Sequence, residues 1–359
     1  MEQLPGQPGL TADAMLAGPR GRSLCVNLLD DRLSPGGRVR RAWPGALHFI
    51  REGDAARGAR GLSECARIAD VSGTPFDRSA LLAGLRAAVE SASYWQEPDA
   101  EDQGFAAGPV REALRPVAEA VAAAVGAPDV RWWTARVDRD RQRCTQFLDQ
   151  HPLPEPLLTG AAESVCAWRA DTLDDERSAH DRPEDPAASY SGWWWSTPAI
   201  SRLPVTTRAL PALGTVGLAL VEDGFGWQSA CCWPVVPKDG TRVYEISGPN
   251  QWAELVDRYP LDVTKSRRHD WWRATGRAGR WLIPDYAAVA ADWDAVHVSV
   301  AGYLTTAGIA IPAGDGACTM LAGWDPDATW WLNDVLAFNG PPENWRADEQ
   351  VPLGWTRTK

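Results

Sequence analysis

The residue types best suited to chemistry gather between positions 265 and 280, where cationic and aromatic side chains alternate. Arginine forks match the oxygens of phosphates and carboxylates, and an indole face can stack on a base. Gly276 and Gly279 would let backbone N–H groups converge on an anion. We therefore expect a loop here that binds a small, anionic, partly aromatic ligand such as a nucleotide. Its side chains are Lys265, Arg267, Arg268, His269, Trp271, Trp272, Arg273, Arg277, Arg280 and Trp281.

The same stretch also fits an interpretation without a ligand. The chain holds 47 acidic residues, so the arginines have many possible partners inside the protein. The tryptophans would then dock the loop on the core. The sequence leaves both interpretations open.

A second candidate is His297, in the run Ala295–Val300, where alternation places His297 and Ser299 opposite three valines. We expect that face to be polar or exposed. A histidine on a rigid strand can act as a general acid or base near neutral pH, so we predict a catalytic role for His297. The alternative is a structural histidine held by hydrogen bonds, because spacing assigns it neither a nucleophile nor a metal.

Glu222 and Asp223 close the apolar run 215–221. A carboxylate at the end of a strand is well placed for catalysis, because the strand holds the following loop in place. We predict Glu222 as a second catalytic residue, and the alternative is that the acidic pair opens a turn.

Three consecutive indoles, Trp193 to Trp195, precede Ser196, Thr197 and Pro198. Alternation sends Trp194 to one side and its two neighbours to the other, so at least one ring should face solvent or a ligand. We predict Trp194 and Ser196 as ligand-binding residues. Packing beneath the segment 171–189 is the alternative.

The order Arg169, Ser196-Thr197, Glu222 resembles the arginine, Ser-Thr-Ser, glutamate order of one class of ADP-ribosyltransferases. Two positions depart from that pattern: Pro198 replaces the final serine, and Asp223 follows Glu222 where a Glu-x-Glu pair would be expected. The resemblance implies an enzyme that uses NAD.

Motifs of several common enzyme classes are absent from the sequence, namely the phosphate loop, the Gly-x-Ser-x-Gly elbow, His-Glu-x-x-His and Cys-x-x-Cys. Gly224-Phe225-Gly226 starts like a dinucleotide fingerprint, but the residues after it read as a strand instead of a helix. Cys231 and Cys232 would point to opposite faces of that strand, so we expect no metal site there. The sequence specifies no cofactor.

The composition is that of a globular protein, with 45% hydrophobic residues and 20 tryptophans beside six tyrosines and six phenylalanines. A net charge of −11 argues against nucleic-acid and anionic-membrane partners. Seven cysteines without a framework spacing fit a reducing compartment. With neither a signal-like start nor a long apolar run, we expect a soluble cytoplasmic protein.

The elements that must position these residues point to an α+β fold, with a mainly helical N-terminal part followed by a mixed or antiparallel sheet with packed helices. We expect a flexible tail at 1–22, an N-terminal domain at 23–170, a surface loop or linker at 171–190 and a C-terminal domain at 191–359. The expected helices are 79–90, 109–125, 249–259 and 285–293. The expected strands are 129–137, 215–221 paired with 230–236 as a hairpin, 242–246 and 295–300, while 329–336 fits either type.

The leading hypothesis is an intracellular enzyme, of the transferase type, whose small anionic and partly aromatic substrate is held by tryptophan and arginine side chains. A noncatalytic protein that binds a protein partner through a tryptophan-rich surface is the first alternative. The second is an enzyme similar to ADP-ribosyltransferases that uses NAD.

Overall fold

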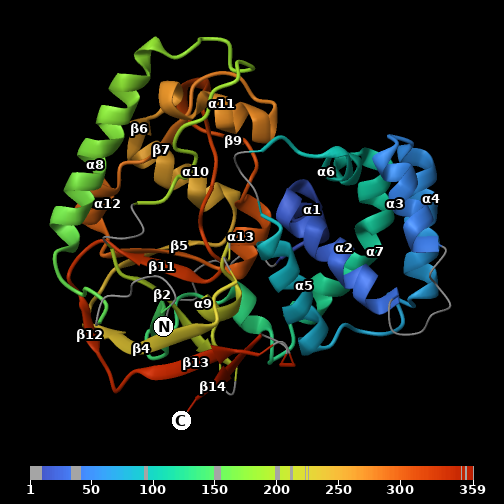
Figure 1. Cartoon of the computed structure of the whole chain (residues 1–359), viewed down its shortest axis with the longest axis horizontal. Helices are drawn as coiled ribbons and strands as arrows, with labels where there is room; N and C mark the ends of the chain where they lie inside the picture. The colour runs from blue at the N-terminus through green and yellow to red at the C-terminus, as the bar shows by residue number, and fades with distance from the viewer. Residues whose placement is uncertain are drawn as a thin grey trace, which may run out of the picture. The chain divides into compact units, whose positions relative to one another are not determined.

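A computed structural model describes residues 10–33, 42–92, 96–148, 155–198, 203–210, 213–222, 224, 226–348, 350–351 and 354–358. The chain forms two compact units, of which unit 1 comprises residues 1–91 and 98–135, and unit 2 comprises residues 92–97 and 136–359. The described part of unit 1 is helical, and that of unit 2 is a mixed sheet with packed helices (Figure 1). The expected α+β fold is confirmed.

Unit 1 is built from helices whose apolar faces pack together. In α5 an aspartate, Asp77, caps the first turn, and Leu81, Leu85 and Val89 are buried at helical spacing. The helices expected at 79–90 and 109–125 are confirmed as α5 and α7. The bounds are α1 Ala12–Ala17, α2 Pro19–Leu33, α3 Ala42–Arg51, α4 Ala55–Ile68, α5 Arg78–Glu90, α6 Ala100–Ala106, α7 Gly108–Val125 and the 3-10 turn η2 Arg131–Thr134.

Two expectations for this part of the chain are wrong. In the range 1–22, placed in a flexible tail, residues 12–17 and 19–22 are helical and only Gly18 between them is extended. Thr11 caps α1, and the side chains of Met15 and Leu16 are buried; residues 1–9 lie outside the described residues. The stretch 129–137, expected as a strand, contains η2. A strand would send Trp132 and Trp133 to opposite faces, whereas in the 3-10 turn both indoles are buried with their ring centroids 6.3 Å apart.

The described strands of unit 2 include a ten-stranded sheet in the order β14-β13-β4-β1-β2-β11-β8-β5, with β12 added to β4 and β3 to β2. Strands β5 and β8 are parallel, and the helices between them make the crossover; the other pairs are antiparallel. In Figure 1, helices α8, α10, α11 and α12 lie above β5 and β11, and β13 and β14 lie below. A core cluster of Val235, Ala295, Trp331 and Leu336 packs on the sheet.

The bounds in unit 2 follow in chain order. The helices and 3-10 turns are α8 Ala161–Ser178, η3 Ala179–Asp181, α9 Val216–Ala219, α10 Pro249–Arg258, α11 Thr264–Thr275, α12 Tyr286–Asp292, α13 Val300–Thr306 and η4 Gly314–Gly316. The strands are β1 Gln142–Phe147, β2 Val205–Leu210, β3 Gly214–Thr215, β4 Ser229–Pro237, β5 Val243–Ile246, β6 Pro260–Asp262, β7 Leu282–Pro284, β8 Ala295–Val298, β9 Ile311–Pro312, β10 Cys318–Thr319, β11 Ala328–Trp331, β12 Leu336–Phe338, β13 Glu343–Ala347 and β14 Trp355–Arg357.

The elements expected at 242–246, 249–259 and 285–293 are confirmed as β5, α10 and α12. The strand expected at 295–300 ends at Val298, and the stretch 329–336 proves to be the end of β11 and the start of β12. The hairpin of 215–221 with 230–236 is wrong, because Val216–Ala219 forms a helical turn and β4 pairs with β1, β12 and β13. The turn forms where the N–H of Gly217 donates to the hydroxyl of Thr207 at 2.8 Å.

The charged stretch at 171–190, expected as a surface loop or linker, begins inside α8, which ends at Ser178. It lacks apolar periodicity because ion pairs such as Arg177–Asp174 occupy its outer face. Unit 1 ends at Ala135, and the main part of unit 2 begins at Arg136.

Candidate functional site

The cationic stretch 265–280 is not the loop that its charge suggested, because Thr264–Thr275 forms helix α11. The carboxylate of Glu176 holds the helix start, accepting from the N–H groups of Lys265 and Ser266 at 2.9 and 2.8 Å. Only the last residues, 276–280, are irregular and exposed. The helix therefore fixes the directions of Arg267, Arg268 and Arg273.

Several arginines of this stretch are paired inside the protein. Arg267 is 1% exposed and binds the carboxylate of Asp175 at 2.8 Å. Burial lowers the pKa of Arg267, while the charge of Asp175 raises it. Arg273 pairs with Asp270 one turn earlier, and the remaining pair, Arg280–Asp262, is exposed at 3.3 Å. These contacts agree with the interpretation in which the arginines pair with acidic residues, and they leave Lys265, Arg268 and Arg277 nearer the surface.

The indoles of α11 also take part in packing. Trp271 is fully buried, and its Nε1 donates to the carbonyl oxygen of Trp194 at 2.6 Å. Trp281 is fully buried beside it in an edge contact, with ring centroids 5.1 Å apart. Trp272 is half-buried. His269 is 1% exposed against the ring of Tyr190, and burial, followed by the charge of Arg268, lowers the pKa of His269.

The chain from Trp193 to Thr197, here named the 193–197 segment, lies against α11. Trp193 and Trp195 share one side and stack with ring centroids 5.4 Å apart, and Trp194 meets Trp195 edge-on, as alternation predicted. Trp193 is 37% exposed, and the guanidinium carbon of Arg267 lies 5.8 Å from its ring centroid. Trp193 is thus the most exposed of the three indoles, and it was not among the predicted ligand-binding residues.

The other end of the 193–197 segment is fastened to residues 322–327, here named the 322–327 turn. Ser196 is fully buried: its N–H donates to the carbonyl oxygen of Ala322, and its Oγ accepts from the N–H of Ala322, both at 2.9 Å. Gly323 follows with a φ of 77°, and a Cβ added there would lie 3.1 Å from the Cβ of Trp195. Only glycine fits this close approach without strain.

Glu222 meets the same turn from the opposite direction. Its N–H donates to Asp325 at 2.9 Å, and its carboxylate accepts a 2.6 Å hydrogen bond from the hydroxyl of Tyr303. Glu222 is 9% exposed and Tyr303 is fully buried. A buried carboxylate that is fixed by hydrogen bonds is suited to stabilise a positive charge on a bound ligand. Asp223, the next residue in the sequence, lies outside the described residues.

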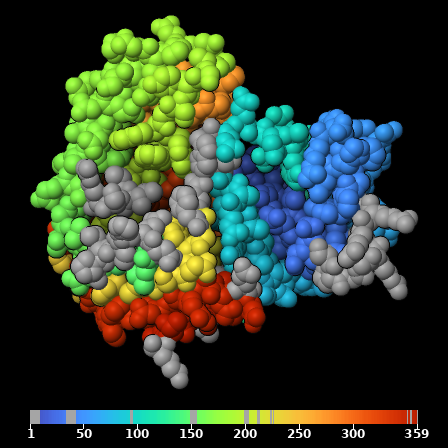
Figure 2. Space-filling view, in the orientation of Figure 1, coloured from blue at the N-terminus to red at the C-terminus, as the bar shows by residue number. Residues whose placement is uncertain are grey.

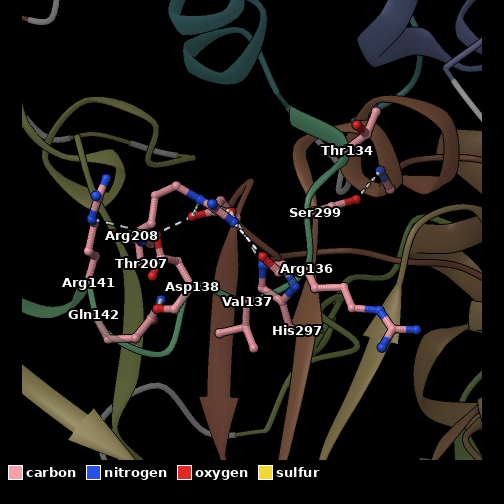
Figure 3. Close-up of polar contacts among 12 residues, drawn as sticks. Thr134, Arg136, Val137, Asp138, Arg141, Gln142, Thr207, Arg208, His297 and Ser299 are labelled. Carbon is pink, nitrogen blue, oxygen red and sulfur yellow. Dashed lines mark hydrogen bonds and ion pairs between the residues drawn. The ribbon is translucent and has the colours of Figure 1, made fainter. Parts of the chain in front are cut away.

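His297 lies in a separate cluster, and its face is polar, as one of the two expected alternatives had it, but buried instead of exposed. Its Nδ1 lies 2.6 Å from Glu245 and its Nε2 3.3 Å from Asp327. Arg208 binds Asp327 at 2.8 Å and reaches from β2 toward Arg136 and His297 (Figure 3). These four residues, Glu245, His297, Asp327 and Arg208, are named the His297 network.

Burial alone would lower the pKa of His297, but the charge of Glu245 and the hydrogen bonds of Asp327 and Glu245 raise it to about 9. The imidazole is therefore positively charged at neutral pH. Because both ring nitrogens are engaged, His297 must break one of these contacts before it exchanges a proton with any ligand.

The structure thus brings some predicted site residues together and separates others. Arg267, Trp271, Trp194 and Ser196 share the surroundings of the 193–197 segment, and Glu222 joins them through the 322–327 turn. His297 contacts Asp327, the last residue of that turn, but its side chain lies in the buried His297 network.

Four residues of these clusters escaped sequence reasoning, since their partners are far away along the chain. The sequence did hint at a turn at Asp327, because this residue follows Asp325-Pro326, a typical turn start. In the structure its φ is 58°. The others are Tyr303, Glu245 and Arg208.

Two buried thiols of the sheet are poorly suited to nucleophilic chemistry. Burial raises the pKa of Cys144 and of Cys232 to about 12, which keeps both thiols neutral and poorly nucleophilic. No group of three or more metal-ligating side chains is found among the described residues. In the same residues, no helix is long and apolar enough to cross a membrane.

Comparison with known proteins adds no relative. No protein-family model matches the sequence, and searches of curated proteins and of solved structures also find no match.

Proposed function

We propose that this protein is an enzyme of the transferase type whose substrate is nucleotide-like, with an aromatic ring and an anionic group. The ring would stack on Trp193, and the anionic group would lie toward two cations nearer the surface, Arg268 on α11 and Arg277 just after it. Glu222 would face positive charge that develops on the substrate. The observation that carries this proposal is the 322–327 turn, because it binds both the 193–197 segment and Glu222.

The burial of Glu222 gives this assignment its chemical content. A carboxylate at low exposure stabilises an adjacent oxocarbenium-like centre, which forms when the bond between a sugar and its leaving group breaks. The hydroxyl of Tyr303 fixes one carboxylate oxygen at 2.6 Å, so the charge needs no reorganisation. The bond from the sugar to the base or nicotinamide of a nucleotide is a substrate bond of this kind.

NAD is the first ligand to test, on two grounds. The residues Arg169, Ser196 and Glu222 resemble an NAD-using class in their order, and a chain of contacts connects them. Arg169 binds Asp285 at 2.5 Å, the next residue, Tyr286, donates to the carbonyl oxygen of Ser196 at 2.9 Å, and Ser196 holds the turn that binds Glu222.

The test measures nicotinamide release from NAD, with water as the acceptor. The bond between ribose C1′ and the nicotinamide nitrogen breaks, its electron pair leaves with nicotinamide, and water bonds to C1′ and loses a proton. Glu222→Gln should lower turnover roughly 100-fold or more while NAD still raises the thermal midpoint. Glu254→Gln, an exposed carboxylate on α10, is the matched control.

A noncatalytic protein-binding role is the second candidate. Tyr190 and Trp193, 39% and 37% exposed, lie in the yellow-green segment after α8 that is on the viewed face in Figure 2. Exposed aromatic side chains in one segment are typical of interaction surfaces. If no nucleotide in a thermal-shift panel binds, and Glu222→Gln and wild type behave alike, the transferase proposal fails and this role is favoured.

A further inference from the structure

The residues that open the main part of unit 2, Arg136 to Asp138, are irregular backbone held by side chains of the sheet. The N–H of Val137 donates to Glu245 at 3.2 Å, and the carbonyl oxygen of Arg136 accepts from Arg208 at 2.8 Å. The carbonyl oxygen of Asp138 accepts from the side chain of Gln142, also at 2.8 Å. Two of these three contacts come from the His297 network.

The network balances its own charge. Two carboxylates, Glu245 and Asp327, face two cations, His297 and Arg208, and the side chains are 16%, 1%, 1% and 7% exposed in that order. A buried charge without its partner is costly, so removing one member penalises the closed arrangement. The backbone of Asp327 adds strain, because its φ of 58° is rare for a residue with a Cβ.

We propose that the His297 network is a charge-dependent latch, which holds the backbone at Val137 on the sheet while all four groups are charged and frees it when His297 becomes neutral. This inference goes beyond the proposed function: Asp327 belongs to both the network and the 322–327 turn, but neither Glu222 nor the 193–197 segment takes part in the latch.

Deprotonation of His297 leaves the network with two negative charges and one positive charge. Without the charge of His297, Arg208 alone faces the carboxylates of Glu245 on β5 and Asp327 before β11. Glu245 is the most exposed member of the network and reaches water most easily. When it turns to water, it gives up its bond to Val137. Since the pKa of His297 is about 9, the latch is closed at neutral pH and opens under alkaline conditions.

Limited trypsin digestion of the full chain reads the latch directly, because Arg136 is itself a cleavage site. The rate of cleavage after Arg136 is divided by the rate after Arg280, which lies in the exposed stretch 276–280. This ratio removes the pH dependence of trypsin. Between about pH 7.5 and about pH 9.5 the neutral fraction of His297 rises on the order of twentyfold, so the wild-type ratio should rise at least tenfold.

Two variants separate the latch from general loosening. His297→Gln leaves two carboxylates against one arginine and should give a high ratio at both pH values. Glu245→Gln removes one carboxylate, so Arg208 still balances Asp327 when His297 is neutral. In this variant the cleavage ratio should not show the tenfold rise with pH. Glu343→Gln, which removes a partly exposed carboxylate near Arg143 in the same sheet, should behave like wild type.

The proposal is overturned if the wild-type ratio is constant with pH, or if Glu245→Gln keeps the full rise. Should His297→Gln fail to fold, wild type and Glu245→Gln still decide the matter. Equal acceleration at Arg136 and Arg280 would indicate unfolding of the whole unit and would also reject the latch.

Discussion

The charge of His297 should make the stability of the protein depend on pH in a particular window. The folded pKa of about 9 lies above the ordinary value of 6.5, so the folded state binds this proton more tightly than the unfolded state. The stabilisation is fully present below about pH 6.5 and is lost as the pH rises toward 9. A shift from 6.5 to about 9 corresponds to about 3 kcal/mol in the free energy of unfolding.

Urea unfolding followed by tryptophan fluorescence measures this loss, because most tryptophans belong to unit 2. The useful range ends near pH 8.5. Above it, unfolded thiols ionise while Cys144 and Cys232 stay neutral in the folded state, which lowers stability for another reason. Carbon-13 labelling of histidine gives the titration of His297 directly by NMR.

His297→Gln should remove the pH dependence between about pH 6.5 and about pH 8.5, and Glu254→Gln should leave it intact. The reasoning is refuted if His297 titrates at or below its ordinary value in the folded protein. It is equally refuted if wild type and His297→Gln lose stability in parallel over this range.

Four further changes test the packing around α11. Asp175→Asn should cost about 3 to 5 kcal/mol of stability, because it leaves the buried charge of Arg267 without its carboxylate. Trp271→Ala should cost about 3 to 5 kcal/mol, since the ring is fully buried, whereas Trp193→Ala should cost less than about 1 kcal/mol and weaken nucleotide binding. Gly323→Ala should cost about 1 to 2 kcal/mol through its positive φ. Urea unfolding measures all four, and a thermal-shift titration with NAD measures binding.

A Trp271→Ala variant as stable as wild type would contradict the packing role of that ring, and the other three predictions can also be contradicted. A stable Asp175→Asn would show that Arg267 is solvated instead of buried. Unchanged NAD binding in Trp193→Ala would remove that ring from the proposed site, and a neutral Gly323→Ala would show that the turn tolerates a side chain.

Local sequence patterns correctly predicted the helices and strands whose capping residues and apolar spacing lie within the element itself. The helix at 79–90 has an aspartate before its first turn and apolar residues at helical spacing, and the structure confirms it as α5. The strand at 242–246 and the helices at 249–259 and 285–293 are confirmed in the same way. The fold class followed from this order, because helices alone fill the first part and mixed types the second.

Patterns failed where long-range contacts decide the local structure. Residues 215–221 look like a strand, yet a hydrogen bond from Gly217 to Thr207 turns four of them into a helix. The cations of 265–280 look like a surface loop. In the structure the cations up to Arg273 lie in helix α11, and carboxylates of α8 bind its first turn and Arg267.

The sequence by itself therefore determined the residue types of the candidate sites: the clustered tryptophans and arginines, Glu222 and His297. Tertiary structure alone decided their partners and exposure. His297 meets Glu245 and Asp327, 52 and 30 residues away, and Glu222 meets Tyr303, 81 residues away. A side chain's charge state and accessibility depend on the groups that surround it in space, and folding brings those groups from distant positions in the chain.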